Sequence, residues 1–139
     1  MQFYGTSDVG RVREANQDCY KFEKLSDYTG FALVCDGMGG AKAGNIASKL
    51  ASEVIGDYLK RSLKPSMSST QIETILRSAV YSANTAVYEA SQKGEEYKGM
   101  GTTVVLMYAD GNSVYILHVG DSRAYSFKDG VLSQLTVDH

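Results

Sequence analysis

An apolar run ends abruptly in an acidic residue and a glycine-rich loop in the stretch Phe31-Ala32-Leu33-Val34-Cys35-Asp36-Gly37-Met38-Gly39-Gly40. A short apolar run bounded by turn residues is typical of a buried β-strand. We therefore predict a strand over residues 31–36 that leads into a loop over residues 37–40. Such a strand needs other elements to bury it, and the residues that follow have a suitable pattern.

Two helices are predicted after the loop from the spacing of their apolar residues. Apolar side chains recur at three- and four-residue steps over residues 43–59 and again over residues 72–90, the period of a helix with one apolar face. Pro65 lies between the two series and interrupts the pattern. Thr70 and Glu73 have the spacing of a capping box, which predicts that the second helix begins there.

Extended segments follow the helices. Four of them are separated by Asp-Gly or Gly-Asp pairs at hairpin-like distances, which predicts an antiparallel meander. They cover residues 102–108, 113–119, 123–127 and 131–135. Because strands, helices and further strands are segregated along the chain, the sequence indicates an α+β fold rather than alternating βαβ units.

Composition narrows the class of protein. The chain has 139 residues, a net charge of -2, 43% hydrophobic and 22% charged residues, which fits one ordinary globular domain. A near-neutral charge gives no basic field for nucleic acid, and no apolar segment approaches the roughly 18 residues of a membrane span. We therefore expect neither nucleic-acid nor membrane partners. Cys19 and Cys35 lack redox or zinc spacing and are predicted to be free thiols in a reducing cytoplasm.

Three aspartates stand at turns or strand ends beside small residues and are candidate metal ligands: Asp18, Asp36 and Asp121. Carboxylates, with backbone carbonyls and water, are the ligands that Mg²⁺ and Mn²⁺ prefer. Gly37 has no Cβ, which would let its carbonyl turn toward an ion that Asp36 holds. The alternative is an ordinary turn, because Asp-Gly pairs are turn signals in most proteins.

Arg13 is a candidate phosphate-binding residue. Its guanidinium can bind phosphate oxygens in a bidentate manner, and it lies five residues before Asp18. The alternative is a solvated surface side chain beside Arg11 and Glu14. A P-loop is excluded because the sequence lacks the pattern GxxxxGK followed by Ser or Thr.

Other polar residues have weaker claims to a chemical role. His118, within an apolar strand, is predicted to be half-buried and hydrogen-bonded to a neighbour rather than a catalytic base. Ser122 has no visible His and Asp partners and no GxSxG elbow. The glycines of residues 99–103 predict close backbone packing at the entry to a strand.

Together and in this order, the motifs resemble those of the metal-dependent Ser/Thr protein phosphatases of the PPM (type 2C) family, in its compact bacterial form. The motifs are Gly10-Arg11-Val12-Arg13, Asn16-Gln17-Asp18, Asp36-Gly37-Met38-Gly39-Gly40, Gly44-Asn45-Ile46-Ala47-Ser48, Gly99-Met100-Gly101-Thr102-Thr103, Val119-Gly120-Asp121-Ser122-Arg123-Ala124-Tyr125 and Leu135-Thr136-Val137-Asp138-His139. The resemblance spans the whole chain and favours the metal interpretation of Asp36 over the turn.

The resemblance implies a fold and a set of catalytic residues. Residues 1–139 would form the N-terminal portion of a single catalytic domain, an α/β/β/α four-layer sandwich, with the C-terminal portion absent. By this resemblance two Mn²⁺ or Mg²⁺ ions share the site: Asp36 bridges them, the Gly37 carbonyl binds one, and Asp18 holds ion-bound water. Asp121 would help form a third, weaker ion site, and Arg13 would bind the substrate phosphate.

The implied reaction is hydrolysis of phosphoserine and phosphothreonine in proteins, including Ser/Thr kinases and their substrates, by water activated between two cations. Met38 occupies the position of a His that is a proposed general acid in many animal members, so acid catalysis by that side chain is not expected. The competing hypothesis is a non-catalytic phosphatase-fold module that binds a phosphoprotein or regulatory partner. Retention of the candidate arginine and aspartates argues against it.

Two expectations concern the family segments that the chain lacks. They would supply two further metal-binding aspartates, so we expect weak metal binding and little phosphatase activity. They would also supply the remaining strands, so we expect an exposed apolar sheet surface that favours self-association or a companion chain.

Overall fold

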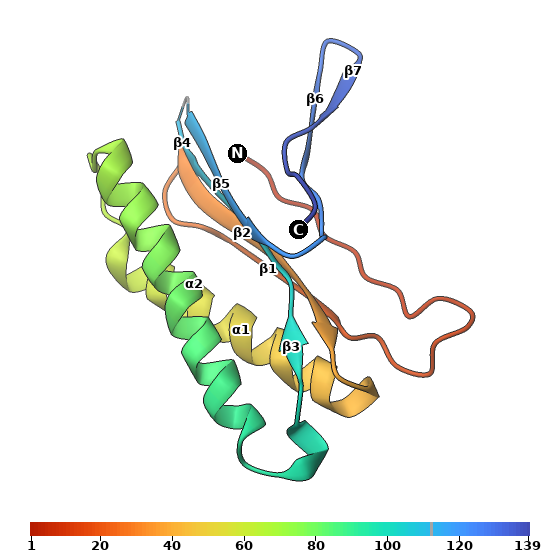
Figure 1. Ribbon diagram of the computed structural model, residues 1–139. Helices are drawn as coiled ribbons and strands as arrows, with labels where there is room; N and C mark the ends of the chain where they lie inside the picture. The colour runs from red at the N-terminus through yellow and green to blue at the C-terminus, as the bar shows by residue number, and fades with distance from the viewer. Residues whose placement is uncertain (112) are drawn as a thin grey trace.

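The computed structural model describes residues 1–111 and 113–139 and has an α+β fold, as predicted (Figure 1). Its elements, in chain order, are β1 (Asp18–Lys24), β2 (Thr29–Met38), α1 (Ala41–Ser62), α2 (Ser69–Ser91), the 3₁₀ turn η1 (Glu95–Tyr97), β3 (Gly101–Thr102), β4 (Val104–Asp110), β5 (Ser113–Val119), β6 (Tyr125–Lys128) and β7 (Val131–Gln134).

Strand β2 is at the centre of an antiparallel sheet with the order β1-β2-β4-β5, and β3 pairs with the last residues of β2. This strand contains the predicted apolar run and continues through Met38. Phe31, Leu33 and Cys35 alternate along it and are buried. Because successive side chains of a strand point to opposite faces, these three residues define the face that packs on the helices.

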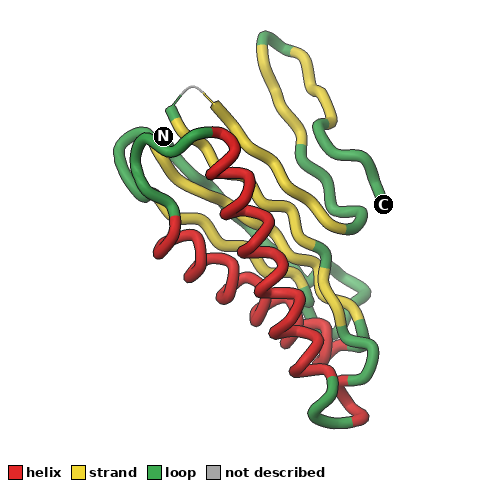
Figure 2. The backbone as a smooth tube through the Cα atoms, turned by 60° about the vertical axis from the view of Figure 1, so that its left-hand side comes forward, coloured by secondary structure: helices red, strands yellow, loops and turns green. Residues whose placement is uncertain are grey.

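Helices α1 and α2 lie on the same side of the sheet (Figures 1 and 2). Both follow the predicted periodicity. The apolar stripe of α1 packs on β2, and that of α2 packs on α1 and reaches β5. The core consists of Phe31, Leu33, Cys35, Ala43, Ala47, Ala51, Ile55, Leu59, Leu63, Ile72, Leu76, Ala79, Ala83, Val87, Met100, Val104, Leu106 and Tyr108. The helical layer therefore buries one face of the sheet, and polar side chains can be exposed at the end of the other face.

The start of α2 differs from the prediction. The capping box is formed by Ser68 and Gln71, not by Thr70 and Glu73: the Ser68 hydroxyl accepts from the Gln71 amide at 3.2 Å, and the Gln71 side chain accepts from the Ser68 amide at 2.9 Å. Ser68 has the extended backbone that an N-cap requires. The helix thus begins two residues earlier than its hydroxyl pattern suggested, because serine and glutamine serve the box as well as threonine and glutamate.

We expect Ser68→Ala to lower the free energy of unfolding by about 1 kcal/mol, because the Gln71 amide at the start of α2 loses its acceptor, the Ser68 hydroxyl. Urea unfolding followed by circular dichroism measures the change. Thr70→Ala is the matched control. Thr70 accepts a hydrogen bond from the Thr74 hydroxyl through its backbone carbonyl, which alanine retains. Equal destabilisation by both variants would contradict the observed cap.

The predicted meander is divided into two sheets. Strands β4 and β5 pair as expected, whereas β6 and β7 form a separate two-stranded ribbon that stands apart from the main sheet (Figure 1). The chain leaves β5 through Gly120, whose φ of 99° lies in a region open mainly to glycine. This bend turns the backbone away from the edge of β5, so β6 does not continue the ladder.

The face of the sheet opposite the helices is apolar and partly open. Val34 and Val114 are 46% and 59% exposed there. The N-terminal segment covers the side nearest β1, where the Phe3 ring stacks on Phe22 with centroids 5.5 Å apart. No helix in the described part of the chain is long and apolar enough to cross a membrane.

Candidate metal and phosphate site

Two of the predicted metal ligands lie directly opposite each other at one end of the sheet. Asp18 on β1 pairs with Asp36 on β2, and we call this pair the Asp18–Asp36 rung. The main-chain groups of Asp36 bond away from β1: its amide donates to the Thr103 hydroxyl and its carbonyl accepts from the Thr103 amide. The rung is therefore of the non-hydrogen-bonded kind, in which opposite side chains come closest.

The proximity of negative charge alters the acidity of Asp36. Its pKa is raised above the ordinary value of 3.8, first by partial desolvation and then by the charge and hydrogen bonding of Asp18, with a smaller contribution from Asp121. Arg13 acts in the opposite direction and lowers the pKa. The metal-free rung thus holds more negative charge than it can readily tolerate, which is an electrostatic condition that a divalent cation relieves.

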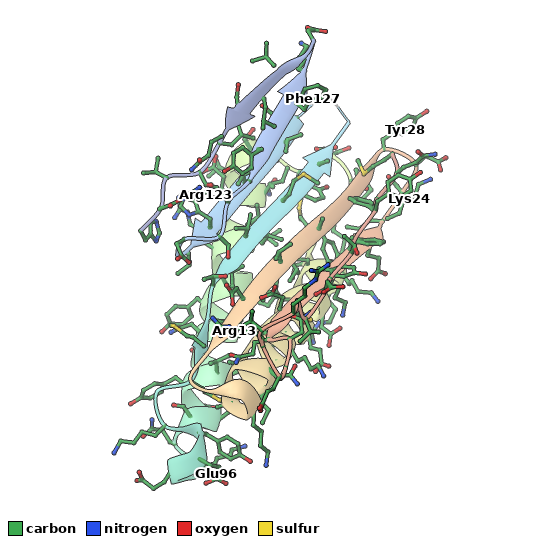
Figure 3. The ribbon with its side chains drawn as sticks, turned by 90° about the vertical axis from the view of Figure 1, so that its right-hand side faces the viewer. Arg13, Lys24, Tyr28, Glu96, Arg123 and Phe127 are labelled. Atoms are coloured by element: carbon green, nitrogen blue, oxygen red, sulfur yellow. The ribbon has the colours of Figure 1, made fainter. Side chains whose placement is uncertain are left out.

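Arg13 lies beside the end of β2 that leads into α1 (Figure 3), on an exposed stretch of the N-terminal segment. Its charge reaches Asp36, so the structure brings together the arginine and the carboxylate that the sequence placed 23 positions apart. Asn16 holds the intervening chain: its Oδ1 accepts from the Asp18 amide at 2.9 Å, and its Nδ2 donates to Ser7 Oγ at 2.6 Å. A cationic side chain therefore stands next to the acidic rung.

Gly37 is enclosed by backbone on both sides. Its amide donates to the Gln17 carbonyl at 3.1 Å, and a Cβ at this position would overlap the Gly44 carbonyl in the first turn of α1. A Cβ on Gly44 would in turn overlap the Gln17 side chain. The three residues form one packed stack, which anchors the start of α1 against the rung and explains why two of them are glycines.

Two neighbouring threonines bond to the main chain of Asp36, and one of them, Thr103, also connects β2 to the turn that contains Asp121. Thr102 Oγ1 donates to the Asp36 carbonyl at 3.0 Å. Thr103 Oγ1 accepts from the Asp36 amide at 3.0 Å and lies 2.7 Å from Ser122 Oγ. Sequence analysis assigned the glycines of this segment to close packing. Gly101, against the Met38 side chain, fits that prediction, whereas Gly99 has open space around it; the hydroxyls were missed. Their only sequence signal is the Thr-Thr pair after Gly101.

The donors present fit a hard divalent cation incompletely. The Asp18–Asp36 rung supplies two carboxylates, and Gly37 adds a backbone carbonyl next to one of them, the oxygen set that Mg²⁺ and Mn²⁺ prefer. Within residues 1–111 and 113–139, however, no three His, Cys, Asp or Glu side chains converge to form a ligand cluster. Asp121 is exposed and affects the rung only through its charge. The chain thus offers a carboxylate pair with an additional acid at longer range.

His118 departs from its prediction. It is half-buried, but its Nδ1 has no hydrogen-bond partner in the described structure. The neighbour is an aromatic ring instead: His118 and His139 have centroids 4.6 Å apart, and His139 Nδ1 accepts from the Gly120 amide at 3.2 Å. The His139 ring therefore packs against His118 but supplies no hydrogen-bond partner for His118 Nδ1.

Both cysteines are free, as predicted. They lie opposite each other on β1 and β2, one position beyond the rung on the helix side. Burial, with a smaller contribution from Cys19, raises the pKa of Cys35 to about 12. A thiol with this pKa is protonated at neutral pH and is a poor nucleophile, which agrees with a packing role.

Comparison with known proteins gives one consistent family. A sequence model described as Protein phosphatase 2C matches residues 7–139. The serine/threonine phosphatase stp of Listeria monocytogenes is 35% identical over 133 residues, which are 96% of this chain and 52% of that protein. Stp1 of Staphylococcus aureus superposes with a TM-score of 0.83 at 36% identity, covering 95% of this chain and 51% of that one.

A further solved structure contains metal. The catalytic domain of the phosphatase PstP in complex with two manganese ions matches with a TM-score of 0.76 at 31% identity, covering 96% of this chain and 54% of that one. The chain therefore spans about half the length of the relatives it matches.

Proposed function

Because the chain belongs to the protein phosphatase 2C family, we propose that it binds Mn²⁺ or Mg²⁺ at the Asp18–Asp36 rung and serves the hydrolysis of phosphoserine and phosphothreonine in proteins. The observation that carries this proposal is the rung itself, which places two carboxylates face to face at an exposed end of the sheet. The proposed protein substrates include Ser/Thr kinases and the proteins that they phosphorylate. The PstP complex with two manganese ions supports the choice of metal.

Each candidate residue has a separate role in the proposed site. Asp36 would contact both cations, Asp18 would orient water beside them, and the Gly37 carbonyl would complete one coordination shell. Asp121, which acts on Asp36 at longer range, would serve a weaker third site. Bound divalent cations would supply a Lewis acid and a lowered pKa for water at the site.

Arg13 is assigned to the substrate. Its guanidinium is exposed and stands next to the acidic rung, where it can pair with the oxygens of a phosphate ester. Fixing the phosphate near the rung positions phosphorus for attack by water, with the positive charge offsetting the negative charge that accumulates on the phosphoryl oxygens. The Cys35 thiol takes no part in this scheme, since it faces the helices and is protonated at neutral pH.

Mn²⁺ titration followed by a phosphothreonine-peptide assay tests the proposal. We expect this chain to bind Mn²⁺ weakly and to turn over little substrate, because its described residues bring only two carboxylates together. A longer product of the same gene should show metal-dependent hydrolysis. Phosphopeptide binding without hydrolysis by the longer product would instead favour the non-catalytic alternative, and inactivity without binding would refute both.

We also propose that the chain self-associates through its exposed apolar sheet surface. Phe127 on the ribbon is 72% exposed, and Val34 and Val114 are open on the main sheet. Light scattering is expected to show a mass that rises with concentration, and Phe127→Ser should reduce the rise. Tyr81→Ser is the matched control, because Tyr81 is 74% exposed on α2, in the helical layer. A concentration-independent monomer mass would contradict this proposal.

A further inference from the structure

The Thr103 side chain contacts both of the segments that carry the candidate acids. Its hydroxyl accepts from the Asp36 amide at 3.0 Å and lies 2.7 Å from Ser122 Oγ. Its methyl group covers Gly120, where an added Cβ would lie 2.7 Å from Thr103 Cγ2. Gly120 and Ser122 are the two neighbours of Asp121 in the chain. One side chain therefore holds the backbone of Asp36 and both flanks of Asp121.

The hydrogen-bond chemistry fixes one of the two contacts of the Thr103 hydroxyl. An amide can only donate, so the Thr103 oxygen accepts from Asp36, whereas either hydroxyl can donate in the contact between Thr103 Oγ1 and Ser122 Oγ. The Thr103 amide donates in return to the Asp36 carbonyl at 2.9 Å. Two hydrogen bonds thus join the main chain of Asp36 to residue 103, and the Thr103 hydroxyl connects this pair to the Asp121 turn through Ser122.

We propose that Thr103 is the positioning residue that sets the placement of Asp121 relative to Asp36, and thereby the affinity of the site for a divalent cation. The inference rests on the proposed function for its metal readout. Outer residues that orient ligands without touching the metal change affinity substantially when they are replaced. Thr102 provides the internal comparison, since its hydroxyl bonds to the Asp36 and Thr103 carbonyls and has no contact with the Asp121 turn among its hydrogen bonds.

The test uses two substitutions of Thr103 and a matched substitution of Thr102. Thr103→Val keeps the branched shape and removes the hydroxyl, and it is expected to weaken Mn²⁺ binding by about tenfold in calorimetry. Thr103→Ser keeps the hydroxyl and should restore most of the affinity. In the Asp121→Asn background the Thr103→Val effect should shrink, because the positioned group is gone, whereas the Thr102→Val effect should stay additive.

A metal-free measurement separates this inference from the proposed function. Amide hydrogen exchange of Asp36, followed by NMR, should speed up in Thr103→Val and remain slow in Thr103→Ser, with a shift of the Ser122 amide resonance in the valine variant alone. If the wild type binds no Mn²⁺, the proposed function fails while the exchange data still decide the positioning role. The inference would be overturned if the Asp36 amide of Thr103→Val exchanged at the wild-type rate and its Ser122 resonance did not move. It would also be overturned if Thr103→Val and Asp121→Asn had additive effects on Mn²⁺ affinity.

Discussion

Asp36→Asn is expected to weaken Mn²⁺ binding by at least about 100-fold, because the substitution removes the carboxylate at the centre of the site, and even outer residues change affinity by 10- to 100-fold. Isothermal titration calorimetry measures the affinity of this chain. Asp110→Asn is the matched control. It makes the same change of charge on the same sheet, but Asp110 pairs with Thr29 at the far end of β2.

The same substitution should stabilise the metal-free protein. The folded-state pKa of Asp36 is raised above 3.8, so this residue favours folding most at low pH, and that contribution is lost as pH rises through the raised pKa. Asparagine has no such dependence. The stability difference between the variant and the wild type should therefore increase from acidic to neutral pH in urea unfolding with a chelator present. Unchanged Mn²⁺ affinity, or a variant that is less stable without metal at neutral pH, would contradict this account.

Gly37→Ala should lower the free energy of unfolding by about 3 kcal/mol, the upper end of the range for overpacking. The new Cβ would overlap the Gly44 carbonyl, and backbone atoms cannot rotate away as a side chain can. To relieve the overlap, either the start of α1 or the end of β2 must move, and both border the rung. Mn²⁺ affinity should fall together with stability.

Gly56→Ala gives the opposite expectation and serves as the control for the previous variant. A Cβ there meets only the flexible end of the Lys21 side chain, and alanine is favoured over glycine within a helix such as α1. Urea unfolding should show Gly56→Ala equal to or more stable than the wild type. If Gly37→Ala were as stable as Gly56→Ala, the close packing of Gly37 against Gly44 would not prevent a larger side chain at residue 37.

Local patterns were sufficient to predict β2 and the two helices, whereas strand β1, which carries Asp18, was not predicted. The apolar run of β2 and the three- and four-residue spacing in α1 and α2 depend on burial, which the sequence displays directly. The predicted start of α2 was wrong. Several Ser and Thr residues near Pro65 can serve as an N-cap, and only the backbone conformation selects Ser68. The division of the meander depended on the bend at Gly120, whose direction a glycine alone does not specify.

The candidate site was predictable as a set of residues but not as a geometry. The motifs pointed to Asp18 and Asp36, yet the register that makes them opposite neighbours comes from a turn over residues 25–28 with no strong sequence signal. Thr103 was missed for a related reason. Its importance arises from contacts with residues 67 and 19 positions away, and a hydroxyl beside a glycine has many ordinary explanations.

The hairpin position of the rung also bears on the order in which the protein can fold. Asp18 and Asp36 meet through a short connection between consecutive strands, and hairpins of this kind close within microseconds. Asp121 follows both helices and strand β4 in the chain, so its approach to this region depends on contacts that are distant in sequence and therefore slow to form. We therefore expect the acidic pair to form early in folding and the third acid, Asp121, to join it late.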